Sequence, residues 1–162
     1  MSRKMILLLI VLGILLILAA SAGAAWYFAM ARGCNPPLPR ANLTVGTHTF
    51  SVELATTMRE QACGLSGRTG LADHDGMLFL FNRGSIQSFW MKDMSFPLDI
   101  IWISGGKVAG FAQNVDPQIG APIWKLKIYT SPPNVDQVLE VNAGTVATDA
   151  IQIGDAVTQG AQ

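Results

Sequence analysis

The chain has 162 residues, enough for one domain with an appended segment, and 50% of them are hydrophobic while only 14% are charged. Three of the eleven basic residues, Arg3, Lys4 and Arg32, precede residue 34, whereas all eleven acidic residues follow it, so the rest of the chain carries a net charge of −3. This balance excludes the basic surface that nucleic-acid binding requires.

Residues 5–30 form an uncharged, mostly apolar stretch. A helix of this length would span roughly 39 Å, more than the ~30 Å of a bilayer's hydrocarbon core. We therefore predict that residues 1–31 are an uncleaved signal segment or single-pass anchor in the inner or cytoplasmic membrane. Arg3 and Lys4 place the N-terminus in the cytoplasm and the domain outside, in the periplasm or the extracellular space. The alternative is a signal peptide, cleaved among the small residues 19–25, that secretes the domain.

A Pro-rich linker is predicted over residues 32–42, followed by a globular β domain over residues 43–158. Cys34 and Cys63 either form one disulfide in an oxidising compartment or remain free thiols. The sequence has no Cys-x-x-Cys pair and no Cys/His cluster, so it predicts neither a metal site nor a cofactor.

The domain begins with two predicted strands within residues 43–55, around a turn at Gly46. Thr57 and Glu60 have the spacing of a capping box, which predicts a short helix that Gly64 ends. The later pattern predicts strands over residues 76–81, 86–92, 97–103, 107–115, 137–144 and 151–158, one helical turn within 145–150, and a long loop over 116–134.

Short strands separated by turns at intervals of roughly 8–12 residues predict an all-β fold. We expect a mostly antiparallel β-sandwich or barrel with two short helices. The loop over residues 116–134 is long for a compact domain, and loops of this length are usually functional or mobile.

Three stretches, GLSGRTGLADHDGMLFLF (64–81), SFWMKDMSFPLDIIWI (88–103) and VLEVNAGTVATDAIQIGD (138–155), resemble in order and spacing the bacterial and archaeal family catalogued as domain of unknown function 192. The resemblance covers residues 43–158. It implies a jelly-roll-like or barrel-like β fold and an exported or membrane-anchored chain, but no activity. The family motif usually reads Trp-Met-Lys-Asn, whereas this sequence has Asp93 at the last position.

Strand alternation places charged side chains among large apolar neighbours. Asp99 shares a strand face with Ile101, and Glu140 shares one with Val138 and Asn142. A half-buried charge of this kind needs a partner, because burying an isolated charge is costly.

Two interpretations remain open at this point. The charged side chains either line a polar pocket or form ordinary salt bridges, and the tryptophans either form a platform for a sugar ring or pack in the core. The ligand-binding candidates are Arg68, Trp90, Lys92, Asp99, Glu140 and Asn142.

The main functional hypothesis is an extracytoplasmic, non-catalytic module that binds a small polar ligand or an envelope component such as a glycan. One alternative is an envelope hydrolase in which Asp99 and Glu140 act as paired carboxylates. The other is a structural or protein-interaction module that uses the loop over residues 116–134, with a partner that the sequence does not identify.

Overall fold

The computed structural model describes residue 34 and residues 36–160, which form a mostly β domain. The anchor predicted over residues 1–31 lies outside these residues. No helix within the described ranges is long and apolar enough to cross a bilayer.

The helices and strands follow the predicted order, with small shifts in their ends. They are β1 (Arg40–Val45), β2 (His48–Ala55), α2 (Met58–Cys63), β3 (Asp75–Ser85), β4 (Ser88–Phe89), β5 (Leu98–Ser104), β6 (Lys107–Val115), η1 (Ile123–Lys125), β7 (Tyr129–Thr130), β8 (Val135–Asn142), α3 (Thr145–Thr148) and β9 (Val157–Gln159).

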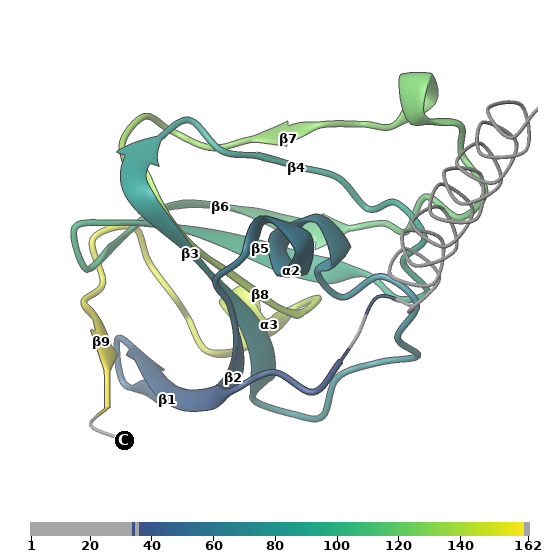
Figure 1. Cartoon of the computed structure of the whole chain (residues 1–162). Coiled ribbons are helices and arrows are strands. Elements are labelled where there is room, and N and C mark those ends of the chain that lie inside the picture. Colours follow the sequence, from purple (N-terminus) through teal and green to yellow (C-terminus); the bar gives the residue numbers. More distant parts are fainter. Residues whose placement is uncertain (1–33, 35, 161–162) are drawn as a thin grey trace, which may run out of the picture. The chain divides into compact units, whose positions relative to one another are not determined.

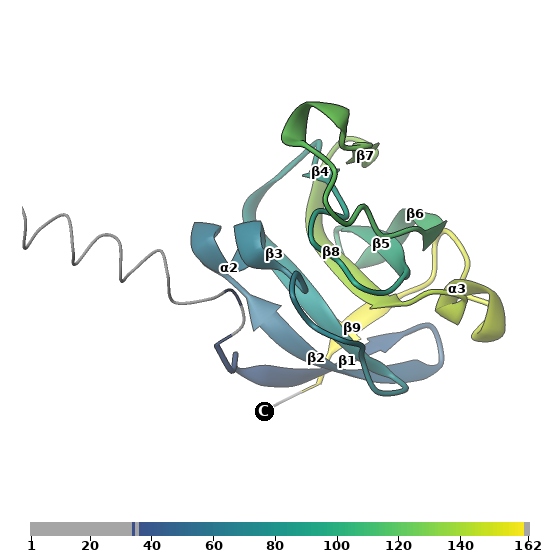
Figure 2. The same cartoon turned by 90° about the vertical axis from the view of Figure 1, so that its right-hand side faces the viewer.

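Seven strands form one sheet in the order β6-β5-β8-β3-β2-β1-β9 (Figure 1). All neighbours are antiparallel except β2 and β3, which are parallel because α2 lies in the connection between them. The sheet curls into a half-barrel (Figure 2). Its two edges approach at one end, where the N–H of Val108 donates to the carbonyl of Asp155 and the N–H of Val157 donates to that of Gly106.

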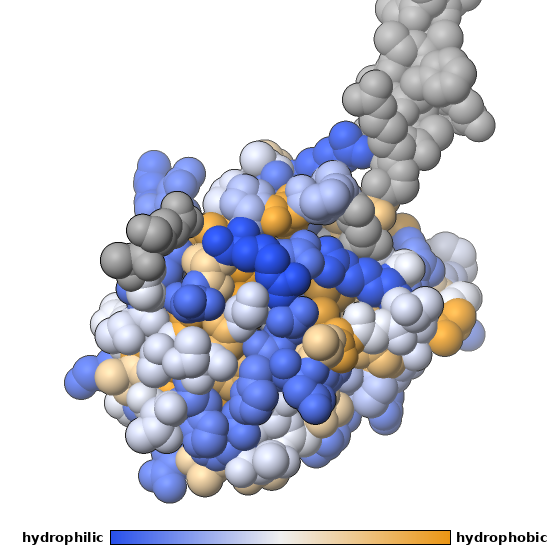
Figure 3. All heavy atoms as spheres, turned by 90° about the horizontal axis from the view of Figure 1, so that it is seen from below, coloured by the Kyte–Doolittle hydropathy of each residue, from blue (hydrophilic) through white to orange (hydrophobic). Residues whose placement is uncertain are grey.

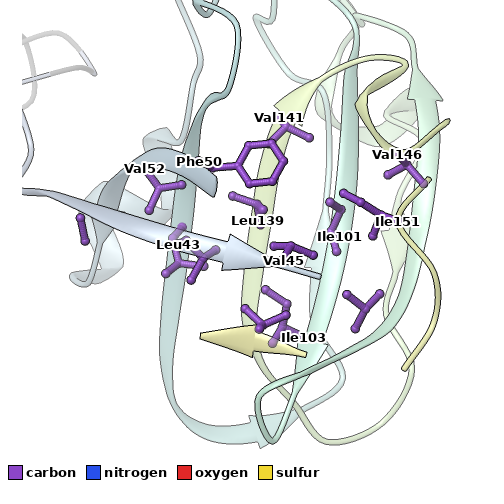
Figure 4. Close-up of a cluster of buried hydrophobic side chains, with 14 of the residues drawn as sticks. Leu43, Val45, Phe50, Val52, Ile101, Ile103, Leu139, Val141, Val146 and Ile151 are labelled. Atoms are coloured by element: carbon purple, nitrogen blue, oxygen red, sulfur yellow. The ribbon is translucent and has the colours of Figure 1, made fainter. Parts of the chain in front are cut away.

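The inner, concave face of the sheet holds one hydrophobic core (Figure 4). All seven strands of the sheet supply it, and its members in β1, β2, β5 and β8 are alternate residues, as the period of two requires. The side chains labelled in Figure 4 are Leu43, Val45, Phe50, Val52, Ile101, Ile103, Leu139, Val141, Val146 and Ile151.

The outer face of β3, β5 and β8 carries a second core. Residues 65, 89, 91, 94 and 129 pack against it from α2's end and from the segments around β4 and β7, which run above the main sheet in Figure 1. Leu98, Ile100 and Trp102 lie in this outer core, whereas Ile101 and Ile103 lie in the inner one. The face assignments made for this strand are therefore confirmed.

The helix signals are also confirmed. Thr57 caps α2: its side-chain oxygen accepts from the N–H of Glu60, and the Glu60 carboxylate accepts from the N–H of Thr57. Gly64 ends the helix with φ 48°, a left-handed conformation that glycine adopts without a steric cost.

The strand predicted over residues 86–92 is wrong in extent, because only β4 is regular there. The backbone from residue 91 onward bonds to loops instead of to a strand: the carbonyl of Lys92 accepts from the hydroxyl of Ser66, that of Asp93 from the N–H of Gly67, and that of Met91 from the N–H of Gln118. The loop over residues 116–134 likewise contains η1 and β7, and the terminal strand is limited to β9.

The surface at the bottom of Figure 1, around β1 and β2, is mainly hydrophilic in Figure 3, with apolar colour only between polar side chains. Exposed apolar side chains instead gather in the segment over residues 119–128. There Ile119, Ile123, Trp124 and Ile128 are 73%, 64%, 84% and 47% exposed.

Cys34 and Cys63 form a disulfide, with their Cα atoms 5.2 Å apart. Of the two alternatives that the sequence leaves open, the structure selects the disulfide. The bond fixes the start of the domain to the last residue of α2.

Replacing both cysteines by serine is expected to lower the free energy of unfolding by about 3 kcal/mol, because the bond closes a loop between residues 29 positions apart. Urea unfolding monitored by circular dichroism measures this change. Dithiothreitol should reproduce the loss in the wild type and have no effect on the double variant. A loss below about 1 kcal/mol would contradict a stabilising role for the disulfide.

Candidate functional site

Glu140 lies in the middle of β8, between Ile100 of β5 and Met77 of β3, and its side chain is on the outer face of the sheet. The end of α2 passes close above it. A Cβ at Gly64 would lie 3.3 Å from Cζ of Phe79 and 3.9 Å from Oε2 of Glu140. Glycine at this position therefore provides both the turn that ends α2 and the close approach to the carboxyl group.

A cavity of about 230 Å³ opens above Glu140. Its walls come from α2 and the residues that follow it, from β3, and from the segment around β4. The lining combines aromatic and apolar side chains with amide, hydroxyl and carboxyl groups: Gln61, Ala62, Cys63, Gly64, Leu65, Ser66, Phe79, Phe81, Gln87, Ser88, Phe89, Trp90, Met94 and Glu140.

The carboxyl group of Glu140 has no hydrogen-bond partner among the described residues, and only 5% of the residue is exposed. Burial disfavours the charged form and raises the pKa of Glu140 to about 8. The group is therefore mostly protonated at pH 7. A protonated carboxyl can donate a hydrogen bond, and it can become an anion when a positive charge enters the cavity.

Asp99, the second carboxylate of the proposed hydrolase pair, lies on the opposite face of the sheet. The register pairs Asp99 with Val141 and Ile100 with Glu140, so the pleat sends the two carboxyl groups to different sides. Asp99 is fully buried, and its oxygens accept from the N–H groups of Asn114 and Val146, each at 2.8 Å. The paired-carboxylate hydrolase is therefore wrong for this chain, and Asp99 has a structural role.

Arg68 shares the outer face with Glu140 but does not reach it. Its guanidinium donates two hydrogen bonds of 2.7 Å to the carboxylate of Glu53, and this hydrogen bonding lowers the pKa of Glu53. Glu53 pairs with Met77 in the sheet, so the ion pair lies two strands, roughly 10 Å, from Glu140.

Lys92 forms an ion pair with the adjacent Asp93 and does not line the cavity. The residue at position 93 has φ 56°, in the left-handed region that Asn and Asp adopt more readily than other side chains. The Asp that replaces the usual Asn here is therefore compatible with the local backbone.

Trp90 is the one predicted candidate that the structure brings to the same cavity as Glu140. It is 45% exposed, so the alternative of core packing is wrong for this residue. Asn142 instead donates to the carbonyls of Leu71 and Ala72, at 3.2 and 3.3 Å, and holds the loop that precedes β3.

Comparison with known proteins places this arrangement in a family. The model of the family described as "Uncharacterized ACR", domain of unknown function 192 (DUF192), matches residues 41–159. The chain belongs to this family. No curated protein sequence matches it.

Two solved structures resemble this DUF192 chain. One is a protein of unknown function from Novosphingobium aromaticivorans, 36% identical, covering 75% of this chain and 86% of its own, with a TM-score of 0.68. The other is a putative transcription regulator from Sinorhizobium meliloti, which is 30% identical and has a TM-score of 0.70. The match covers 77% of this chain and 97% of that protein's chain.

A second hollow of the DUF192 domain, of about 350 Å³, lies beside α3. Nδ1 of His48 and of His74 lie 3.6 and 3.8 Å from Oδ2 of the buried Asp149 carboxylate. The sequence did not predict this cluster, since its members lie far apart along the chain. No set of three or more His, Cys, Asp or Glu residues within the described ranges could hold a metal ion.

The aromatic walls of the first cavity were also missed as site residues. Phe79 and Phe81 fall in a stretch predicted only as a buried strand. Their spacing of two indicates a shared face, but the sequence does not show that β3 pairs with β8 and so brings that face to Glu140.

Proposed function

We propose that this DUF192 domain is an extracytoplasmic, membrane-tethered module that binds a small ligand in the cavity above Glu140. The observation that carries the proposal is the buried carboxyl group without a partner at the base of an aromatic-lined cavity. A few polar groups placed in a mostly apolar pocket are typical of small-molecule sites.

The unpartnered carboxyl favours a binding role because it makes the free domain less stable. Burial without a protein partner disfavours the charged form of the carboxyl, so an apolar side chain at position 140 would suit the sheet better. A group retained at such a cost is a candidate for recognition, since a ligand can supply the missing partner.

The lining also refines the kind of ligand. The cavity offers four aromatic side chains and one ionisable group, beside two glutamine amides and two serine hydroxyls. The walls therefore favour a small ligand with an apolar body and one polar or charged group.

The location outside the cytoplasm remains part of the proposal. It is supported by the uncharged stretch over residues 5–30 and by the disulfide between Cys34 and Cys63, a bond typical of oxidising compartments. The membrane is the one partner we propose for the N-terminal segment.

Ligand binding can be tested by a thermal-shift screen on the full-length chain in a maltoside detergent, with small amines, alcohols, carboxylic acids and sugars. Hits are expected to raise the melting temperature of the wild type and of Met58→Trp, but not of Ala62→Trp. Ala62 and Met58 are both exposed on α2, but only Ala62 lines the cavity, so the pair separates a blocked cavity from a general effect of the substitution.

A screen without hits, or with hits that Ala62→Trp leaves unchanged, would refute the proposal. It would favour the interaction module instead. The exposed apolar segment over residues 119–128 would then be the surface to examine.

A further inference from the structure

We infer that the ligand of this cavity is a small organic cation of the alkylammonium type, whose charged head binds between the Glu140 carboxylate and the aromatic side chains. The inference rests on the proposed function and specifies its ligand class. It is carried by the charges, the shape and the lining of the cavity.

The first argument is the sign of the charge. Glu140 is the only group lining the cavity that can ionise, because Cys63 is held in the disulfide and no Lys, Arg or His is among the described lining residues. An anionic ligand would meet no counter-charge there. A cation would meet the Glu140 carboxyl group, which has no partner among the described residues.

The second argument is the aromatic wall. Phe79, Phe81, Phe89 and Trp90 all line the cavity, and Phe79 and Phe89 meet edge to face with their ring centroids 4.9 Å apart. The faces of aromatic rings attract cations within ≈ 6 Å, and the recognition of quaternary ammonium ligands is the usual functional role of this attraction.

The third argument is size. A volume of about 230 Å³ is smaller than the range of roughly 300–1,000 Å³ found for drug-sized ligands. It suits a cation of a few carbon atoms.

The charged groups on the surrounding elements do not line the cavity, and most have partners of their own. The Glu60 carboxylate caps α2, Arg68 bonds to Glu53, Lys92 bonds to Asp93, and Asp99 faces the inner core. The other charged side chains of α2, β3, β5 and β8 that do not line the cavity are Arg59, Asp75, Arg83 and Asp136. A bound cation would therefore interact mainly with Glu140.

Binding of a cation is coupled to loss of a proton. In the free domain the Glu140 carboxyl is mostly protonated at pH 7, and the bound cation stabilises the carboxylate, so one proton passes from the carboxyl group to the buffer. Affinity should rise by about tenfold per pH unit between pH 6 and 7 and become constant above the Glu140 pKa of about 8.

The test is isothermal titration calorimetry on the full-length chain, in a maltoside detergent and an amine-free buffer, at pH 6, 7, 8 and 9. The probes are choline and 3,3-dimethylbutan-1-ol, a neutral molecule of nearly the same shape. Choline is expected to bind at least about tenfold more tightly than the alcohol at pH 8.

The matched variant is Glu140→Gln, which keeps the shape of the side chain and removes its charge. The variant is expected to bind choline at least about tenfold more weakly than the wild type does. Its affinity for the alcohol should stay within about threefold of the wild-type value. Phosphocholine is the third probe and distinguishes a free cation from a lipid headgroup. If the ligand is a free cation, the added phosphate weakens binding. If it is a lipid headgroup, phosphocholine binds as tightly as choline.

Equal binding of the two probes, choline affinity that does not rise with pH, or an unchanged affinity in Glu140→Gln would overturn the inference. The proposed function would still stand if the alcohol or any other compound bound the wild type and not Ala62→Trp. It would fall only if no compound bound in that way, so the two failures are distinguishable.

Discussion

Replacing Asp99 by alanine is expected to lower the free energy of unfolding by about 4 kcal/mol. The substitution leaves the buried N–H group of Val146 and the partly buried N–H group of Asn114 without their acceptors, each now bonded at 2.8 Å. These bonds connect β5 to the end of β6 and to the start of α3, so the loss should affect the whole domain. Equilibrium urea unfolding at pH 7 measures it.

Asp73→Ala is the control for this experiment. Asp73 is exposed and makes no hydrogen bond or ion pair with the described residues, so its removal should change stability by less than about 0.5 kcal/mol. A cost below about 1 kcal/mol for Asp99→Ala would show that water replaces the carboxylate. It would contradict the structural role of Asp99.

Glu140→Gln is expected to raise the free energy of unfolding, whereas Asp99→Ala lowers it. The size of this increase should depend strongly on pH. The pKa of Glu140 is about 8 in the folded domain, against an ordinary value of 4.5. Between these values the folded chain holds more protons than the unfolded chain, so the stability contributed by the carboxyl group is complete below pH 4.5 and is lost as the pH rises to 8. The change is on the order of 5 kcal/mol.

The measurement is the difference in the free energy of unfolding between Glu140→Gln and the wild type, from pH 4 to pH 9 without ligand. The free energy of unfolding of the variant minus that of the wild type should increase steadily up to about pH 8 and then stay constant. Taking the difference cancels the contributions of Glu53 and Glu60, whose lowered pKa values act on stability in acid. A difference that stays constant across this range would mean that the Glu140 carboxylate has a partner in solution.

Much of the fold follows from local patterns in the sequence. The alternation in residues 97–103 correctly divides Ile101 from Ile100 between two cores, because a pleated strand has a period of two wherever it occurs. The capping box at Thr57 and the glycine at position 64 correctly bound a helix for the same reason: the signals act within one turn.

The failures lie where contacts between distant segments override the local pattern. The sequence predicts one strand over residues 86–92, but the carbonyls of residues 91–93 bond to residues 66, 67 and 118, and Met91 and Met94 are both buried. The strand order, with β8 between β5 and β3, also has no local signal.

The same limit applies to the site. The sequence correctly identified Glu140 as a charge among apolar neighbours, but not its relation to the other candidates. Asp99 and Glu140 seemed to be a pair because each faces large side chains, whereas the register of β5 against β8 sends them to opposite faces. The aromatic wall depends on the pairing of β3 with β8, which only the folded chain reveals.

The central claim is that Glu140 is a buried carboxyl group that has no partner among the described residues and is available to bind a ligand. Carbon-13 NMR of the Glu140 side-chain carboxyl in the full-length chain, assigned by its absence in Glu140→Gln, follows the protonation of this group directly as the pH changes. The account predicts a titration midpoint near pH 8 without ligand, and a midpoint near the ordinary 4.5 would contradict it.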